Sequence, residues 1–104
     1  MITKKEAVRL SINHWRRMIR WAKKQDQRGY ADVQLMLDDI KDDWFSAHCS
    51  LCKLGCPNCP LDEKYGNCNV RHSDNQWYNV IESLTWGAWV KNAELLLEQL
   101  KSLR

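Results

Sequence analysis

The sequence of 104 residues lacks an apolar run long enough to cross a membrane, and residues 1–6 lack the apolar run of a signal peptide. We therefore expect a cytoplasmic protein with no membrane partner. The chain also lacks internal repeats, low-complexity tracts and long linkers. These absences predict a single domain over residues 1–104, which is small enough to gain from a structural staple.

Motifs of several function classes are missing as well. No Gly-rich phosphate loop, RNA-stacking aromatic motif or helix-turn-helix pattern is present, which disfavours sequence-specific reading of nucleic acid. The three histidines are scattered and the acidic residues fall on predicted helix surfaces, so that no nucleophile, base and orienting group can be assembled. We therefore predict that the protein is not an enzyme.

Cysteine, in contrast, is concentrated: all five cysteines lie between residues 49 and 68. Two C-x-x-C pairs three residues apart have the spacing of zinc knuckles. An odd count in a cytoplasmic protein disfavours disulfides, and the order C-x2-C-x3-C-x2-C differs from that of bacterial ferredoxins. A thioredoxin-like redox pair would need a βαβ context that is absent. We predict one structural Zn²⁺ ion, which can supply roughly 10–16 kcal/mol of apparent binding energy.

Tetrahedral zinc takes four ligands, so one cysteine is spare. The first four cysteines would close the site within eleven residues, which is cramped. A wider ring draws the loop 60–67 into the site, and this is the preferred ligand set: Cys49, Cys52, Cys59 and Cys68. Cys56 is the alternative ligand, and its exchange with Cys59 stays open. His48 and His72 flank the cluster, and each could replace a thiolate.

The N-terminal part is predicted to be helical, because apolar residues recur at steps of three and four. A capping box at Thr3 and Glu6 opens a first helix predicted over residues 4–26. Asp32 is the predicted N-cap of a second helix that runs to about Trp44. The apolar stripe of the first helix comprises Val8, Ile12, Trp15, Ile19 and Ala22.

Two more helices are predicted after the cysteines. A capping box over residues 73–76 opens a short helix, and Thr85 caps a last helix that carries regularly spaced apolar residues. The six tryptophans are expected to pack in the core. The fold class is therefore mainly α, a small domain of about four helices stapled by a zinc-binding loop. It divides into a helical hairpin (1–47), the zinc loop (48–72) and C-terminal helices (73–104).

Charge is segregated along the chain. Residues 1–28 carry nine Lys/Arg against two acids, whereas residues 29–50 carry five Asp against one Lys. The candidate partner- or nucleic-acid-binding residues lie on the polar side of the first helix: Arg16, Arg20, Lys23, Lys24 and Arg28. Such a face is either simply solvated or a surface for phosphates or an acidic protein.

The acidic residues of the second helix are expected to face outward: Asp38, Asp39, Asp42 and Asp43. Paired carboxylates can bind divalent cations, but no companion histidine or third ligand is evident. Solvation, or pairing with the basic first helix, is the expected role. Leu95 and Leu96 lie off the apolar stripe of the last helix and, if both are exposed, would favour self-association or a partner.

The assembled motifs resemble those of small cysteine-rich proteins of unknown function encoded by tailed bacteriophages and prophages. The features that carry the resemblance are His14-Trp15, Trp86-Gly87-x-Trp89 and the core C-x-x-C…C-x-x-C-P…G-x-C from Cys49 to Cys68. The resemblance implies a zinc-stapled helical protein of phage origin that resides in the host cytoplasm.

Two functions from different classes follow. The first is a non-enzymatic binding module, a phage factor that docks on a host protein and modulates or inhibits it, such as a defence or nucleic-acid-processing component. The second is nucleic-acid binding through the basic first helix. The remaining hypothesis is a zinc enzyme. In that case three cysteines would bind the ion, and water would occupy the fourth coordination position. An uncovered basic face would weaken the first reading relative to the second.

Overall fold

The structure, a computed structural model, describes residues 3–44, 60–66 and 74–104. Within these ranges the regular secondary structure is helical, apart from one isolated antiparallel bridge between Tyr30 and Thr85. The prediction of a mainly α fold is therefore confirmed. The helices of the described part are α1 (Lys4–Ala22), α2 (Val33–Ile40), α3 (Pro60–Tyr65), α4 (Trp77–Ile81) and α5 (Trp86–Lys101).

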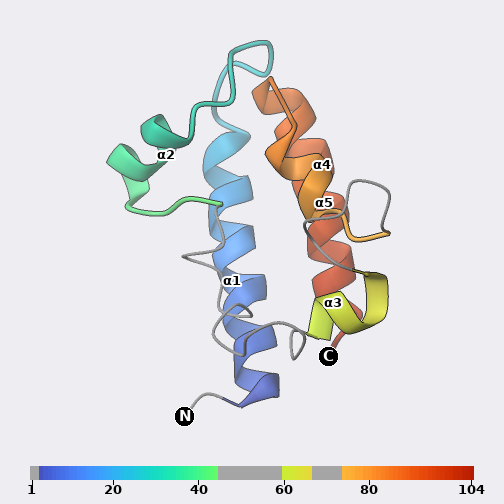
Figure 1. Cartoon of the computed structure of the whole chain (residues 1–104). Helices are drawn as coiled ribbons and strands as arrows, with labels where there is room; N and C mark the ends of the chain where they lie inside the picture. The colour runs from blue at the N-terminus through green and yellow to red at the C-terminus, as the bar shows by residue number, and fades with distance from the viewer. Residues whose placement is uncertain (1–2, 45–59, 67–73) are drawn as a thin grey trace.

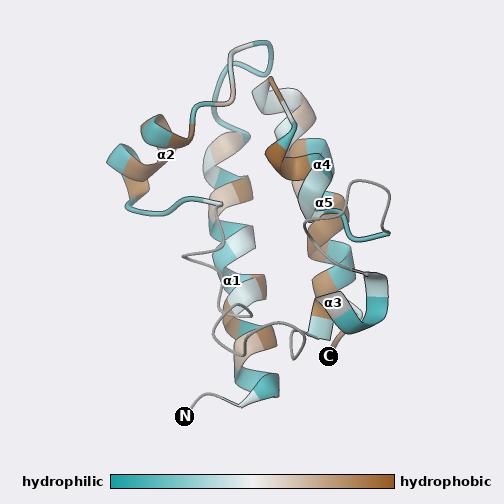
Figure 2. Cartoon of the chain, in the orientation of Figure 1, coloured by the Kyte–Doolittle hydropathy of each residue, from teal (hydrophilic) through white to brown (hydrophobic). Residues whose placement is uncertain are grey.

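Helices α1 and α5 lie side by side and run in opposite directions (Figure 1). Helix α4 packs on α5, while α2 lies on the outer side of α1. The connection between α1 and α2 is hydrophilic, as expected for a segment that runs over the surface (Figure 2). No helix of the described residues is long and apolar enough to cross a membrane.

Helix α1 begins where the sequence predicts. The Thr3 Oγ1 accepts a hydrogen bond from the Glu6 backbone N–H at 3.1 Å, and the predicted apolar stripe is buried. The helix ends at Ala22, however, rather than near Asp26. The following segment is held against the start of α5, because Trp86 N–H donates to the Gly29 carbonyl and Gly87 N–H to the Gln27 carbonyl, both at 2.9 Å. This pairing requires the chain to leave the helix early.

Helix α2 likewise begins as predicted and ends early. Asp32 is its N-cap and accepts from the Gln34 backbone N–H at 2.9 Å. The helix ends at Ile40, and Lys41 adopts a left-handed conformation with φ 58°. The prediction of a helix up to Trp44 is wrong, because Asp42 and Trp44 turn inward onto the core instead of continuing along the surface.

The last helix begins where the sequence predicts, whereas α4 begins only at Trp77, after the predicted capping box, and its N-cap Gln76 makes no side-chain cap hydrogen bond. The Thr85 hydroxyl caps α5 and accepts from the Ala88 N–H at 3.2 Å. At the start of α4 the buried Asn75 side chain accepts from the Trp77 N–H at 3.0 Å, while its amide donates to the Gly66 carbonyl at 3.1 Å. Ser73, the first residue of the predicted capping box, lies outside the described residues.

The six tryptophans form the centre of the core, as predicted: Trp15, Trp21, Trp44, Trp77, Trp86 and Trp89. Trp15 stacks on Trp89 at 5.9 Å between ring centroids, and Trp86 makes an edge contact with Trp21 at 5.2 Å. Such aromatic pairs contribute about 0.5–1.5 kcal/mol beyond their buried area. The tryptophan cluster therefore joins α1, α4, α5 and the residues after α2 into one packed unit.

Candidate functional site

The predicted metal ligands lie outside the described residues. All five cysteines (Cys49, Cys52, Cys56, Cys59 and Cys68), together with His48 and His72, fall in residues 45–59 and 67–73. In the ranges that the structure describes, no group of three or more His, Cys, Asp or Glu side chains is placed to hold a metal ion. Structural zinc and the choice of its four ligands therefore stay predictions.

The residues next to the cysteines are nevertheless well anchored. The predicted loop after Cys59 contains the short helix α3, in which Pro60 and Leu61 are buried. The Tyr65 hydroxyl lies 2.5 Å from the Ser102 hydroxyl, at the end of α5. Gly66 has φ 98°, as expected of a glycine in a tight turn. Helix α3 is thereby attached to the C-terminal end of α5.

The acidic residues after α2 are not all solvated. The side chain of Asp42 is only 13% exposed, and its carboxylate oxygens lie 3.1 Å from His14 Nδ1 and 3.2 Å from Arg17 Nη1. The second ring nitrogen of His14 lies 3.2 Å from the Asp43 carbonyl. Asp43 is also buried, so the prediction that both residues face outward without a companion histidine is wrong.

This cluster has a clear electrostatic role. Both nitrogens of the His14 ring face acceptor oxygens, one the Asp42 carboxylate and the other the Asp43 carbonyl, and Arg17 adds a permanent positive charge beside Asp42. Asp39 adds a further link between α2 and α1, because its carboxylate accepts a hydrogen bond from the Trp21 indole N–H. The predicted pairing of the acidic segment with the first helix thus occurs through His14, Arg17 and Trp21. It attaches α2 and the residues after it to α1.

The candidate binding residues of the first helix are all exposed, but they fall into two groups. Arg16, Arg20 and Lys23 line a groove between α1 and α5. Lys24 and Arg28 follow the end of α1 and do not line it. The acidic α2 segment does not cover the basic residues in the groove, because it contacts a different side of α1.

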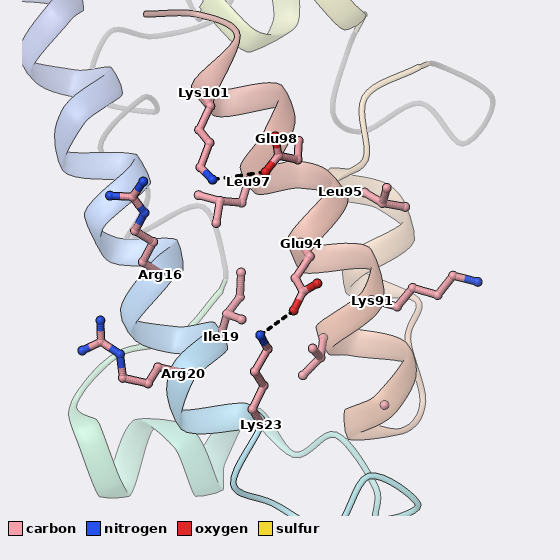
Figure 3. Close-up of a pocket in the computed structure, with 12 residues that line it drawn as sticks. Arg16, Ile19, Arg20, Lys23, Lys91, Glu94, Leu95, Leu97, Glu98 and Lys101 are labelled. Carbon is pink, nitrogen blue, oxygen red and sulfur yellow. Dashed lines mark hydrogen bonds and ion pairs between the residues drawn. The ribbon is translucent and has the colours of Figure 1, made fainter.

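The groove between α1 and α5, here called the central groove, has a volume of about 830 Å³. Ile19 of α1 and Leu97 of α5 point into the space between the helices, and Val90 completes this apolar floor (Figure 3). Arg16 and Arg20 lie over α1, whereas Lys91 lies at the far side of α5. The groove thus combines a largely buried apolar floor with a cationic rim on α1 and a rim of mixed charge on α5, which carries Glu94 and Glu98 beside Lys91 and Lys101.

A second groove of about 740 Å³ lies toward the N-terminal end of α1 and is here called the lower groove. It shares Arg16 with the central groove, so the two are adjacent along α1. Its apolar lining comes from Val8, Ile12 and Leu103. Its charged lining comprises Lys4, Lys5, Glu6, Arg9, Arg16 and Arg104.

Many cations of the two grooves are not neutralised. In the central groove Lys23 pairs with Glu94 at 2.9 Å, and Lys101 pairs with Glu98 at 3.1 Å. In the lower groove Lys4 pairs with Glu63 at 3.6 Å. Among the described residues no ion-pair partner is found for the remaining groove cations, which are Lys5, Arg9, Arg16, Arg20, Lys91 and Arg104. The combined surface is therefore strongly positive.

The sequence did not predict the contribution of α5. Its polar residues Lys91, Glu94, Glu98 and Lys101 recur at steps of three and four beside the apolar stripe, a pattern that could have identified them. The neighbouring leucines are divided: Leu96 is buried, whereas Leu95 is 46% exposed and lines the central groove. Because only one of the two leucines is exposed, the wide apolar patch that would have favoured self-association or a partner is not present at these residues.

Comparisons of the chain with protein-family models, curated proteins and solved structures found no match. The resemblance to phage-encoded cysteine-rich proteins accordingly rests on the motif residues alone and stays a prediction.

Proposed function

We propose that this protein is a non-enzymatic binding module that docks on another protein through the face formed by α1 and α5. The observation that carries the proposal is the central groove, where apolar residues lie between the cationic rim of α1 and the mixed-charge rim of α5. Apolar area supplies affinity in protein interfaces, while charge at the rim sets specificity and association rate. In keeping with the motif resemblance, the proposed partner is a host protein that a phage factor modulates or inhibits.

The alternative function is nucleic-acid binding. It is favoured by the exposure of the basic residues of α1, which the acidic α2 segment does not cover. Arg16 and Arg20 could neutralise phosphates without sequence preference. Two features of the central groove favour a protein instead. Glu94 and Glu98 lie in its lining and would repel phosphates, and none of the described residues that line it is an aromatic on which bases could stack.

The proposed function also includes the structural zinc ion as its scaffold. Four thiolates would close the coordination shell and leave no position for water or substrate, which agrees with a binding role rather than catalysis. The anchoring of α3 to Ser102 supports this view, since it ties the chain next to the cysteines to the helices that form the groove.

A pull-down from bacterial lysate at moderate salt tests the proposal. The wild-type protein is compared with Arg16→Glu/Arg20→Glu, which reverses two groove charges, and with Lys24→Glu/Arg28→Glu, which reverses two charges outside the groove. We expect a stoichiometric partner with the wild type and the second variant, and its loss with the first. The absence of any stoichiometric protein would count against the proposal, and a shift of DNA or RNA at low salt that only the groove variant loses would favour the alternative.

A further inference from the structure

The lower groove differs from the central groove in its charge. Its lining contains five cationic side chains and a single side-chain carboxylate, that of Glu6. The start of α1 forms one wall, and the other wall comes from Leu103 and Arg104 after α5, at the same end of the molecule (Figure 1). Glu94 and Glu98, which would repel phosphate in the central groove, are absent from the lining of the lower one.

Most cations of the lower groove are free to contact a ligand. Lys4 pairs with Glu63 at 3.6 Å, and both side chains of this pair are more than half exposed. The other cations that α1 contributes are Lys5, Arg9 and Arg16, and all three are exposed. Among the described residues none of the three has an ion-pair partner. A ligand can therefore reach three positive charges without breaking an existing ion pair.

These three cations lie on one face of α1. Positions 5, 9 and 16 are separated by four and seven residues, close to one and two helical turns, and at 1.5 Å per residue they extend over about 16 Å. The exposed amide of Asn13, four residues after Arg9, adds an uncharged hydrogen-bond donor on the same side. Lys5 and Arg9 repel each other at their i, i+4 spacing, so an anion bound between them would relieve a destabilising contact within α1.

The apolar part of the lining contributes little to recognition. Val8 and Ile12 belong to the core and are only 4% and 3% exposed. None of the described residues that line the lower groove is aromatic. A ligand is therefore held by charge and hydrogen bonds rather than by apolar area, which favours a small anion with many charged oxygens.

We infer that the lower groove binds a compact polyphosphate, a ligand with two or three linked phosphate groups, through Lys5, Arg9 and Arg16. Guanidinium groups can donate two hydrogen bonds at once to phosphate oxygens, and lysine adds a point charge. The groove volume of about 740 Å³ is typical of small-molecule sites. Beyond Arg16 the lining of the central groove brings in carboxylates, so the positive stretch is too short for an extended nucleic-acid strand.

This inference goes beyond the proposed function and does not depend on it, because the protein partner is assigned to the central groove.

Titration with inorganic tripolyphosphate tests the inference. Isothermal titration calorimetry at physiological ionic strength compares the wild type with Lys5→Gln/Arg9→Gln, which removes two charges from the groove. The matched control is Lys24→Gln/Arg28→Gln, which removes two charges outside both grooves. We expect the control to bind within about threefold of the wild type and the groove variant to bind about tenfold or more weakly. Circular dichroism checks that each variant remains folded.

Nuclear magnetic resonance locates the bound anion. We expect tripolyphosphate to shift the side-chain Nε–Hε signals of Arg9 and Arg16 and to leave the signal of Arg28 unchanged. Polyphosphates also chelate metal ions, which provides a distinct outcome. Shifts confined to residues 49–68 would indicate a reaction with the predicted zinc ion and would overturn the inference.

Three further results would overturn it. The first is no binding of tripolyphosphate at physiological ionic strength, and the second is equal weakening in the two variants, which would reduce the effect to net charge. The third is tighter binding of a single-stranded oligonucleotide that only the groove variant loses, which would assign the groove to nucleic acid. The proposed function is tested separately, because its pull-down varies Arg16 and Arg20 rather than Lys5 and Arg9.

Discussion

At the scale of single residues, the most informative side chain is Asp42. It lies in an acidic segment and was predicted to be solvated, yet its carboxylate accepts a hydrogen bond from Arg17 and lies 3.1 Å from His14 Nδ1. A partly buried carboxylate needs such partners, because leaving it unpaired would cost more than the hydrogen bonds themselves contribute. Asp42 therefore attaches the segment after α2 to α1.

We expect Asp42→Asn to lower the free energy of unfolding by about 1–2 kcal/mol, since the amide loses the charge that His14 and Arg17 both contact. Asp38→Asn is the matched control. Asp38 is exposed, and its carboxylate accepts a hydrogen bond from the Gln34 side chain four residues earlier, so its replacement should cost less than about 0.5 kcal/mol. Urea unfolding monitored by tryptophan fluorescence measures both. Equal effects of the two changes would show that the Asp42 cluster adds nothing beyond surface charge.

At the scale of secondary-structure elements, the N-terminal caps could be predicted and the C-terminal ends could not. Thr3, Asp32 and Thr85 cap their helices as expected, because a cap is a hydrogen bond within four residues of the chain. The early ends of α1 and α2 have distant causes. Gln27 and Gly29 pair with the start of α5, and the residues after α2 turn onto α1.

Gly87 shows how closely these elements approach. Its N–H donates to the Gln27 carbonyl at 2.9 Å, and a Cβ at this position would lie 3.0 Å from the same oxygen. The backbone N–H of the neighbouring Trp86 donates to the Gly29 carbonyl, so the connection between α1 and α2 cannot move away from α5 without losing these backbone hydrogen bonds. The glycine of the W-G-x-W motif is therefore explained by contact between the α1–α2 connection and α5.

Gly87→Ala should accordingly destabilise the protein by about 1 kcal/mol. Alanine has a helix propensity about 1 kcal/mol more favourable than that of glycine, but its Cβ would crowd the Gln27 carbonyl and weaken the backbone hydrogen bonds there, and we expect this cost to be larger. The matched control is Lys91→Ala, an exposed position of the same helix, with an expected change within about 0.5 kcal/mol. Thermal and urea unfolding give both values. A clear stabilisation by Gly87→Ala would mean that the Gln27 segment moves aside freely.

At the scale of the whole molecule, the packing of α1 against α5 produces the candidate interface. Neither helix alone forms a groove: α1 supplies Ile19 and two arginines, and α5 supplies Leu97 and a second rim. The tryptophan cluster beneath fixes their separation, since Trp15 of α1 stacks on Trp89 of α5. Stability of the core and the shape of the binding surface are thus coupled.

Zinc is predicted to act at this scale too. Native mass spectrometry should find one zinc ion per chain, and EDTA should lower the melting temperature markedly, because the ion can supply as much free energy as a domain of this size has in total. Serine replacements of Cys49, Cys52, Cys59 and Cys68 should each reduce zinc binding, whereas Cys56→Ser should retain it. Protein without stoichiometric metal that melts at the same temperature in EDTA would refute the staple.

Sequence patterns alone predict the helical class, the starts of α1, α2 and α5, the burial of the tryptophans and the identity of the basic residues. Each of these follows from periodicity, capping or hydrophobicity within a short stretch of chain. Three features become visible in the folded molecule alone: where α1 and α2 end, the burial of Asp42 beside His14, and the groove that Arg16 and Arg20 line and Arg28 does not. Those features depend on which helices become neighbours, and neighbours distant in the chain are chosen by packing of the whole core.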